Sequence, residues 1–306
     1  MILITGRNGQ LGWELRRTLA PLGPVTAVDV EEMPLDDTDA IRRVVRKLRP
    51  SLIVNAAAHT AVDRAEDEPD LALAVNGVAP AVLADEVKRL GGGIVHYSTD
   101  YVFDGAKKQA YDEGDPPRPA GVYGETKLAG EAAVRGVGVP HLILRTSWVY
   151  GARGSNFLRT ILRAAAAGKP LRVVDDQHGA PTWCRMLAEA TALVLAQTGA
   201  ALRPDALEDY GGTYHLTGGG ATTWFGFAEA ILALAPQPVR DACPGITPVP
   251  TRAYPTRARR PANSRLDGSK FRETFGFSLP DWRESLELVM AEIPATEFTP
   301  NEGTAP

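Results

Sequence analysis

Two groups of residues in this sequence have the types and the spacing needed to move a hydride and a proton. The first is the segment Gly6–Gly12, which reads GRNGQLG and spaces its glycines as GxxGxxG. It follows a short apolar run and opens a helical pattern. In that context glycines let the main chain approach a pyrophosphate and present a helix N-terminus to it. We therefore predict that this turn binds a dinucleotide.

The second group is Tyr123 and Lys127, which form a YxxxK pattern. Residues four apart lie on the same side of a helix, so we expect the ammonium of Lys127 beside the phenol of Tyr123. A neighbouring positive charge favours the phenolate, and we expect a lowered pKa that lets Tyr123 donate and accept a proton near neutral pH. Thr99 follows a predicted strand and offers a hydroxyl to the same substrate oxygen.

Charged residues near the glycine turn bear on the choice of cofactor. Asp29 ends the second predicted strand, close to the usual place of a carboxylate that accepts the adenosine ribose hydroxyls. That carboxylate repels a 2′-phosphate, whereas Arg7 in the glycine turn could pair with one. The sequence therefore favours NADH without excluding NADPH, and a solvated strand end stays open for Asp29. We expect the acidic residues Glu31 and Glu32 to be solvated.

The hydrophobic pattern predicts the elements that position these residues. Five short apolar runs are predicted as buried strands, at Met1–Thr5, Val25–Asp29, Leu52–Asn55, Ile94–Tyr97 and Leu142–Arg145. Helical patterns alternate with them, at Leu11–Leu19, Asp39–Leu48, Leu71–Leu90 and Thr126–Val134. This alternation predicts an α/β fold with a doubly wound parallel Rossmann sheet, in which ligands bind at the carboxyl ends of the strands.

The pattern is less regular after Tyr150. We predict a dinucleotide-binding Rossmann domain over residues 1–150, with a return segment near 178–217 that adds a strand at Thr213–Leu216. Residues 151–177 and 218–294 are predicted to form a second, smaller substrate-binding lobe. Frequent prolines between Pro236 and Pro261 argue against long helices there. The polar tail, 295–306, is predicted to be disordered.

Composition excludes several classes of protein. The 306 residues are 44% hydrophobic and carry a net charge of −4, which excludes a largely disordered chain and gives no global attraction for nucleic acid. No apolar run reaches the roughly 18 residues of a membrane-spanning helix. Cys184 and Cys243 lack the spacing of a zinc site. We expect a cytoplasmic protein with neither a nucleic-acid nor a membrane partner.

Several strings along the chain resemble those of the extended short-chain dehydrogenase/reductase superfamily, and within it the dTDP-4-dehydrorhamnose reductase family. They are spread over nearly the whole chain and include GQLGWEL, VNAAAHTAVDRAE, HYSTDYVFDG, VYGETKLAGE, RTSWVYG and RPANSRLD. The resemblance implies NADPH- or NADH-dependent reduction of the 4-keto group of dTDP-4-dehydro-β-L-rhamnose to dTDP-L-rhamnose, the last step of dTDP-rhamnose biosynthesis. Tyr123 would give the proton, Lys127 would hold the nicotinamide ribose, and Thr99 would orient the carbonyl.

The resemblance also implies which residues contact the ligands. The cofactor contacts would be Gly6, Asn8, Gly9, Gln10, Leu11, Asp29, Asp36, Ala56, Ala57, Ala58, Tyr123 and Lys127. The substrate contacts would be Thr99, Asp100, Trp148 and Arg260. Core packing stays open for Trp148, and a solvated surface position stays open for Arg260. His59, within the alanine string, is expected to be structural.

Other functions of this superfamily differ in identifiable residues. Sugar-nucleotide 4,6-dehydratases carry an Asp-Glu pair after the fourth strand, and Tyr101 stands here in place of the glutamate. Reduction of another nucleotide 4-keto-sugar stays open, as does a non-catalytic NADP-binding regulatory subunit. The resemblance implies a homodimer as well. Some family members join protomers through metal-bound carboxylates; Glu14 is present, but Arg185 stands where another carboxylate is expected, so we predict no metal site.

Overall fold

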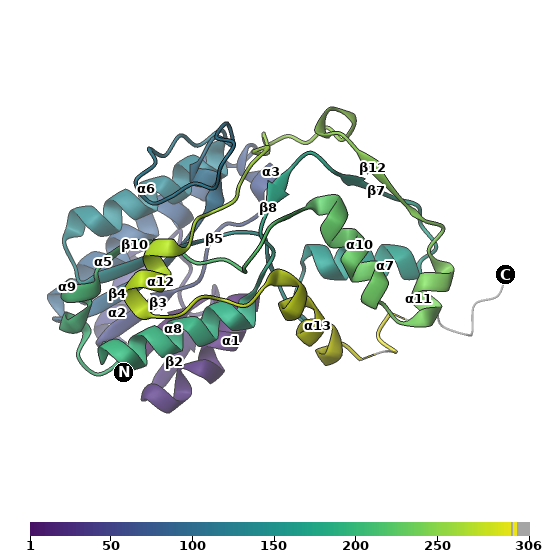
Figure 1. The fold of residues 1–306 in the computed structure, drawn as a ribbon. Helices are drawn as coiled ribbons and strands as arrows, with labels where there is room; N and C mark the ends of the chain where they lie inside the picture. The colour runs from purple at the N-terminus through teal and green to yellow at the C-terminus, as the bar shows by residue number, and fades with distance from the viewer. Residues whose placement is uncertain (295, 299–306) are drawn as a thin grey trace.

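The computed structural model describes residues 1–294 and 296–298 of the chain. Figure 1 shows two parts side by side: a large sheet flanked by helices, and a smaller group of helices and short strands. All strands of the six-stranded sheet are parallel. Their order is β10 (Gly212–His215), β5 (His141–Thr146), β4 (Gly93–Thr99), β3 (Leu52–Asn55), β1 (Ile2–Thr5) and β2 (Val25–Val28). The predicted α/β doubly wound fold is confirmed.

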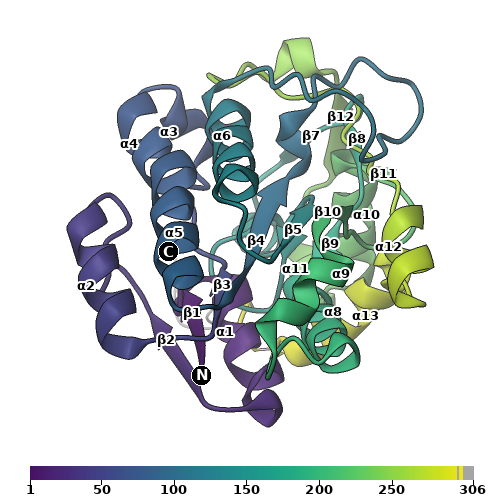
Figure 2. The ribbon, with the colours of Figure 1, turned by 90° about the vertical axis from the view of Figure 1, so that its left-hand side faces the viewer.

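Helices cover both faces of this sheet (Figure 2). One face is packed by α2 (Thr38–Leu48), α5 (Ala79–Arg89) and α6 (Val122–Val137), and the other by α1 (Gln10–Thr18), α8 (Cys184–Thr198) and α12 (Ser269–Phe275). Along β1, Leu3 points into the first of these cores, whereas Ile2 and Ile4 point into the second. Successive strand residues face opposite sides, so a sheet buried on both faces needs unbroken apolar strands.

The helix predicted at Leu71–Leu90 is interrupted. It consists of α4 (Pro69–Leu73), a π-helical turn (Ala74–Val78) and α5. Asn76 lies in the π-helical turn and holds the segment after β3: its Oδ1 accepts from the backbone N of His59 at 2.8 Å and its Nδ2 donates to His59 O at 3.1 Å. The prediction of one regular helix was therefore wrong, because these long-range bonds have no signal in the hydrophobic period. A further short helix, α3 (Val62–Ala65), lies between β3 and α4.

The smaller part has its own apolar core. It contains α7 (Phe157–Ala166), α10 (Trp224–Leu234), α11 (Gln237–Ala242) and α13 (Trp282–Glu292), with β7 (Leu171–Val174) paired in parallel with β12 (Ile246–Val249). The proline-rich segment thus holds one short helix and one short strand. The prediction of a disordered tail was wrong for residues 296–298, since Phe298 is buried in this core and Glu297 pairs with Arg159. The rest of the predicted tail, 295 and 299–306, lies outside the described residues.

Short strand pairs join the two parts. β6 (Val149–Tyr150) pairs with β9 (Thr182–Trp183), and β8 (His178–Gly179) pairs with β11 (Thr222–Thr223). The chain returns to the large sheet through α8, α9 (Leu207–Tyr210) and β10. Single 3₁₀ turns complete the described elements, at Ala20–Leu22, Asp100–Val102, Pro204–Ala206 and Thr251–Ala253. In the residues the structure describes, no helix has the length and apolar character needed to cross a bilayer.

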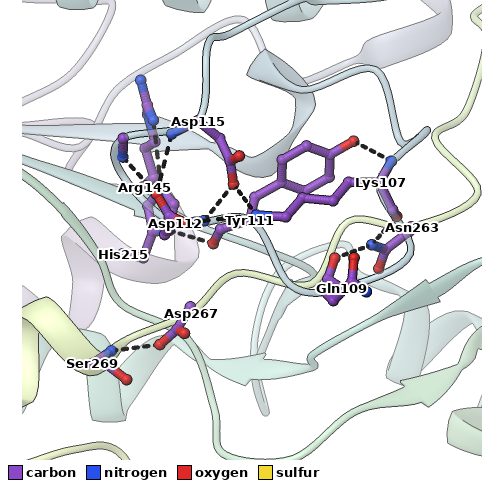
Figure 3. A network of polar contacts seen from close by, with 11 residues as sticks. Lys107, Gln109, Tyr111, Asp112, Asp115, Arg145, His215, Asn263, Asp267 and Ser269 are labelled. Carbon is purple, nitrogen blue, oxygen red and sulfur yellow. Dashed lines mark hydrogen bonds and ion pairs between the residues drawn. The ribbon is translucent and has the colours of Figure 1, made fainter.

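A polar network binds the loop after β4 to the segment that precedes α12 (Figure 3). Asn263 Nδ2 donates to the carbonyl oxygens of Lys107 and Gln109, at 2.7 Å each. His215 in β10 meets Tyr111 O through Nδ1 at 3.1 Å, and burial lowers the pKa of His215 to about 4. Its uncharged ring lies 3.4 Å from Arg145 Nη1, so the network adds no second positive charge beside this arginine.

Arg145, which belongs to this network, also forms a buried ion pair with Glu131. Arg145 in β5 donates from Nε to Glu131 Oε1 at 2.8 Å and from Nη2 to Glu131 Oε2 at 2.7 Å. The two residues are 3% and 0% exposed, so the guanidinium of Arg145 supplies interactions that water would otherwise give the carboxylate. Glu131 Oε2 also accepts from Arg135 Nη1, at 3.2 Å.

We predict that Arg145→Met lowers the free energy of unfolding by about 3 kcal/mol, because it leaves the Glu131 carboxylate buried without its bidentate partner. Urea unfolding at neutral pH measures this. Arg89→Met is the matched control: Arg89 pairs with Asp85 on the surface at 2.9 Å, and its loss should cost under about 1 kcal/mol. Equal losses in the two variants would contradict the prediction.

Candidate active site

A cleft of about 570 Å³ opens at the carboxyl ends of β1, β3, β4 and β5. All of the predicted catalytic, cofactor and substrate residues line it, with one exception. Asp36 instead lines an adjoining cavity of about 340 Å³, which shares Gly6, Asp29, Ala57 and Ala58 with the cleft. The structure thus brings the predicted residues together in one place, and the role of each stays a prediction.

The glycine turn lies at one end of the cleft. Gly6 has φ +75°, and a Cβ there would lie 3.1 Å from the main chain of Ala57. A Cβ on Gly12 would lie 1.9 Å from Gly6 O, so only glycine lets α1 start this close to β1. Gly9 precedes the helix, whose first main-chain N–H groups have no acceptor within the helix. Such a turn and helix N-terminus fit the pyrophosphate of a dinucleotide.

The first turn of α6 is anchored from two sides. The backbone N of Val122 donates to Glu66 Oε1 at 2.9 Å. A Cβ on Gly124 would lie 2.2 Å from Tyr101 O, so α6 packs directly on the 3₁₀ turn that follows β4. The ring of Tyr123 consequently lies 5.6 Å from that of Tyr101, at 74° to it.

The hydroxyl of Thr99 lowers the pKa of Tyr123, but burial raises it by more. Thr99 Oγ1 also donates to Asp100 Oδ1 at 2.9 Å and accepts from the backbone N of Tyr101 at 3.1 Å. Asp100 is 2% exposed, and burial raises its pKa to about 6. A phenol, a hydroxyl and a carboxyl group therefore form a short polar chain along the wall of the cleft.

Lys127 does not lower the pKa of Tyr123 as predicted. Its Nζ donates instead to Tyr97 O at 2.6 Å, and burial raises the pKa of Tyr123 above its usual value. Burial also lowers the pKa of Lys127 to about 8, against the opposing effect of Glu131. The prediction placed both residues in one cleft, but burial is the main influence on the pKa of Tyr123, and the charge of Lys127 does not lower it.

The ammonium of Lys127 has room for another partner. It carries three N–H donors, and among the described residues the structure gives it one hydrogen bond, to Tyr97 O. Lys127 is 3% exposed and lines the cleft. Two of its N–H groups thus lack an acceptor among the described residues, and they lie in the same cleft as the glycine turn. Such donors fit the ribose hydroxyls of a nicotinamide nucleotide.

A second polar chain lies behind Lys127, between neighbouring strands. Thr5 Oγ1 donates to Asn55 Oδ1 at 2.7 Å, and Asn55 Nδ2 lies 3.0 Å from His96 Nδ1. Burial, and to a lesser extent the charge of Lys127, holds the pKa of His96 well below its usual value. His96 is therefore uncharged at neutral pH.

Trp148 has an unusual backbone and a covered ring. Its φ is +47°, and its indole stacks on that of Trp224 with centroids 3.6 Å apart and an angle of 8°. A Cβ on Gly179 would lie 2.4 Å from the Trp148 indole, so the ring lies flat against this glycine. Trp224 starts α10 in the smaller part and also lines the cleft. Trp224 could not be predicted as a cleft residue, because no motif marks it and its partner is far away in sequence.

Arg260 and Glu32 both form ion pairs that the sequence did not predict. Arg260 lines the cleft, but Nη2 donates to Asp63 Oδ2 at 2.6 Å and Nη1 donates to Tyr101 OH at 3.0 Å. Its predicted contact with the substrate therefore has to compete with these two partners. Glu32 is exposed, as predicted, with 45% of its side chain accessible, and it also pairs with Arg7 at 2.7 Å.

Two more residues can be placed against their predictions. His59 is held through its main chain by Asn76, and its Nε2 lies 3.5 Å from Glu68, in keeping with a structural position. Arg185 pairs with Glu14 at 3.3 Å and also with Glu292. Within the described residues, no group of three or more acidic, histidine or cysteine side chains is arranged to hold a metal ion.

Comparison with known proteins decides the family. The RmlD substrate binding domain family matches residues 1–294. A dTDP-4-dehydrorhamnose reductase of Burkholderia thailandensis is 48% identical over 296 residues, which cover 95% of this chain and 98% of that protein. The chain belongs to the dTDP-4-dehydrorhamnose reductase family. Membership confirms the predicted resemblance and the predicted class, an oxidoreductase.

Solved structures of dTDP-4-dehydrorhamnose reductases have the same fold. One from Clostridium acetobutylicum has a TM-score of 0.85 at 35% identity, covering 95% of this chain and 98% of the other. One from Bacillus anthracis, in complex with NADP, has a TM-score of 0.84 at 33% identity with the same coverage.

We predict that Lys127→Met raises the free energy of unfolding of the ligand-free protein at pH 7, by up to about 3 kcal/mol, because it removes a buried charge. The folded pKa of Lys127 is about 8, below its ordinary value of 10.5, so the destabilisation is complete below pH 8. It disappears as the pH rises towards 10.5, where the unfolded chain also loses the proton. Urea unfolding at pH 7 and pH 9.5 tests this.

The control is Lys88→Met, since Lys88 also donates to a main-chain carbonyl, Val137 O, but from an exposed position. Its substitution should change stability by under about 1 kcal/mol at either pH. A Lys127→Met variant that is less stable than the parent at pH 7 would contradict the assignment of a costly buried ammonium.

Proposed function

We propose that this protein reduces the 4-keto group of dTDP-4-dehydro-β-L-rhamnose to dTDP-L-rhamnose with NADH or NADPH, and that Tyr123 donates the proton. One observation carries the proposal: a single cleft is lined by the glycine turn, by Tyr123 and Lys127, and by Thr99. The family supplies the reaction class, since its relatives are named for this reduction. The contacts and burial of Tyr123, Lys127 and Thr99 in this cleft support the role of each.

The bound dihydronicotinamide would supply the hydride that adds to C4 of the sugar. The glycine turn and the N-terminus of α1 would hold its pyrophosphate, and Asp29 the adenosine ribose. Asp36, with Val30, Met33 and Leu35, would border the adenine, because these residues line the adjoining cavity. Lys127 would bind the nicotinamide ribose with the N–H bonds that Tyr97 O leaves unused.

The proton would come from Tyr123. Hydride addition to C4 places negative charge on the carbonyl oxygen, and a hydroxyl donor stabilises that charge most in the transition state. The raised pKa of Tyr123 keeps the phenol protonated at neutral pH, which suits a donor in the direction of reduction. Transfer of the O–H proton to O4 leaves a phenolate, which Thr99 stabilises until water returns a proton.

The sugar nucleotide would lie between the two parts of the molecule. The stacked indoles of Trp148 and Trp224 and the polar groups of Asp100 and Arg260 all line the same cleft. Tyr101 occupies the position of the glutamate found in dehydratases, which supports reduction rather than elimination. None of these side chains distinguishes thymine by an identified contact, so a reductase of another nucleotide 4-keto-sugar is the competing activity.

We predict that Tyr123→Phe lowers kcat at least about 100-fold while the Kd of NADH changes little, because only the proton donor is lost. Steady-state oxidation of NADH and NADPH with the 4-keto sugar nucleotide measures the rate, and quenching of protein fluorescence measures the Kd. The control is Tyr254→Phe, which removes a phenol hydroxyl from a residue 50% exposed and outside the cleft. Unchanged turnover in Tyr123→Phe would overturn the proton-donor assignment. Cofactor binding without any turnover in the parent protein would instead indicate the regulatory subunit.

We predict that Trp148→Ala raises KM for the sugar nucleotide about tenfold and leaves the Kd of NADH unchanged, because it removes one aromatic face from the substrate side of the cleft. Trp13→Ala is the control, since Trp13 stacks with Arg17 away from the cleft. The measurement should use dTDP-, UDP- and GDP-linked 4-keto-sugars in parallel. A higher kcat/KM for UDP- or GDP-linked substrate would replace the proposed substrate by the competing one.

The predicted homodimer and the predicted cytoplasmic location remain predictions. Light scattering of the purified protein across a range of concentrations would test the homodimer.

A further inference from the structure

Glu32 uses both of its carboxylate oxygens near the glycine turn. Oε1 accepts from Arg7 Nη1 at 2.7 Å, and Oε2 accepts from the backbone N of Asp29 at 3.0 Å. The turn after β2 fixes this position, because the backbone N of Glu32 donates to Asp29 O at 3.1 Å. Glu31 adds a second, longer contact to Arg7 Nη2 at 3.7 Å. The guanidinium of Arg7 is thus already engaged by two carboxylates.

Arg7 lies where the adenosine ribose of a dinucleotide is expected. It follows Gly6 directly, and its backbone N donates to Val28 O at the end of β2, at 3.1 Å. The neighbouring Asn8 donates its backbone N–H to Asp29 Oδ2 at 2.7 Å. The adjoining cavity is lined by two carboxylates, Asp29 and Asp36, and its lining contains neither lysine nor arginine. Arg7 is therefore a cation of the glycine turn that lies beside the end of β2 and next to Asn8, which binds Asp29.

A 2′-phosphate at that position would carry nearly two negative charges. It would approach Asp29, Glu31 and Glu32, and it would gain an ionic partner only if Arg7 left Glu32. A cofactor that ends in a free 2′-hydroxyl meets no such competition, because Asp29 accepts from hydroxyls. The side chains of Arg7 and Glu32 are 28% and 45% exposed, so water screens this ion pair. Breaking it costs little free energy, and a bound 2′-phosphate can replace Glu32 as the partner of Arg7. The expected discrimination is therefore moderate.

We propose that Glu32 determines cofactor choice in this protein, favouring NADH over NADPH by holding Arg7 away from the 2′-phosphate. Arg7 alone would make this turn suited to NADPH, and the acidic residue three positions after Asp29 reverses that preference. The inference rests on dinucleotide binding at the glycine turn, as in the proposed function, and is independent of the sugar substrate.

The test is the Kd of NADH and of NADPH, titrated by fluorescence without any sugar nucleotide, for the parent protein and for Glu32→Gln. Glutamine keeps an oxygen for the backbone N of Asp29 but removes the charge that binds Arg7. The parent should bind NADH about tenfold more tightly than NADPH. In Glu32→Gln the Kd of NADPH should fall about tenfold, while that of NADH changes less than about threefold.

Two further variants separate this mechanism from a general charge effect. Glu31→Gln removes the same charge from the longer contact and should improve NADPH binding by less than about threefold. Arg7→Ala added to Glu32→Gln should abolish the gain, because it removes the freed guanidinium. The proposal is overturned if the parent prefers NADPH, if Glu32→Gln leaves its Kd unchanged, if Glu31→Gln gives an equal gain, or if the gain survives without Arg7. Binding of neither cofactor to the parent would overturn the dinucleotide site itself, whereas cofactor binding without turnover would affect only the proposed reaction.

Discussion

The chemistry of the cleft depends on a positive charge buried under its floor. Lys127 is 3% exposed, and its ammonium has a main-chain carbonyl, Tyr97 O, as its hydrogen-bond acceptor among the described residues. A charge buried with so few partners is costly, and its pKa falls as a result. Glu131 lies one turn further along α6, but both of its oxygens are bound by Arg145. The charge of Lys127 is therefore left partly uncompensated, and Lys127 lines the cleft.

The two buried histidines, His96 and His215, add no positive charge to that of Lys127. His96 and His215 are both buried and both kept uncharged, because desolvation lowers their pKa values. Arg145 is neutralised by its bidentate contact with Glu131. In the proposed reduction, the ammonium of Lys127 would interact favourably with the negative charge that develops on the substrate oxygen.

Much of the fold could be predicted from the sequence because its signals are local. The parallel strands appear as short apolar runs, and the glycine turn and the YxxxK pair each lie within one segment. What could not be predicted depends on contacts across the chain. The π-helical turn at Asn76, the two-residue strands such as β6 and β9, and the stack of Trp224 on Trp148 have partners far away in sequence. The direction of the pKa shift of Tyr123 was mispredicted for the same reason, since burial is a property of the packed structure.

The stacked indoles of Trp148 and Trp224 have an optical consequence. They belong to different parts of the molecule and, at 3.6 Å between centroids, are in full van der Waals contact. A molecule that enters between them must separate the rings and change the polarity around two of the five tryptophans. A ligand that separates the two rings would therefore change the intrinsic emission of the protein, and its binding could be followed without a dye or a label.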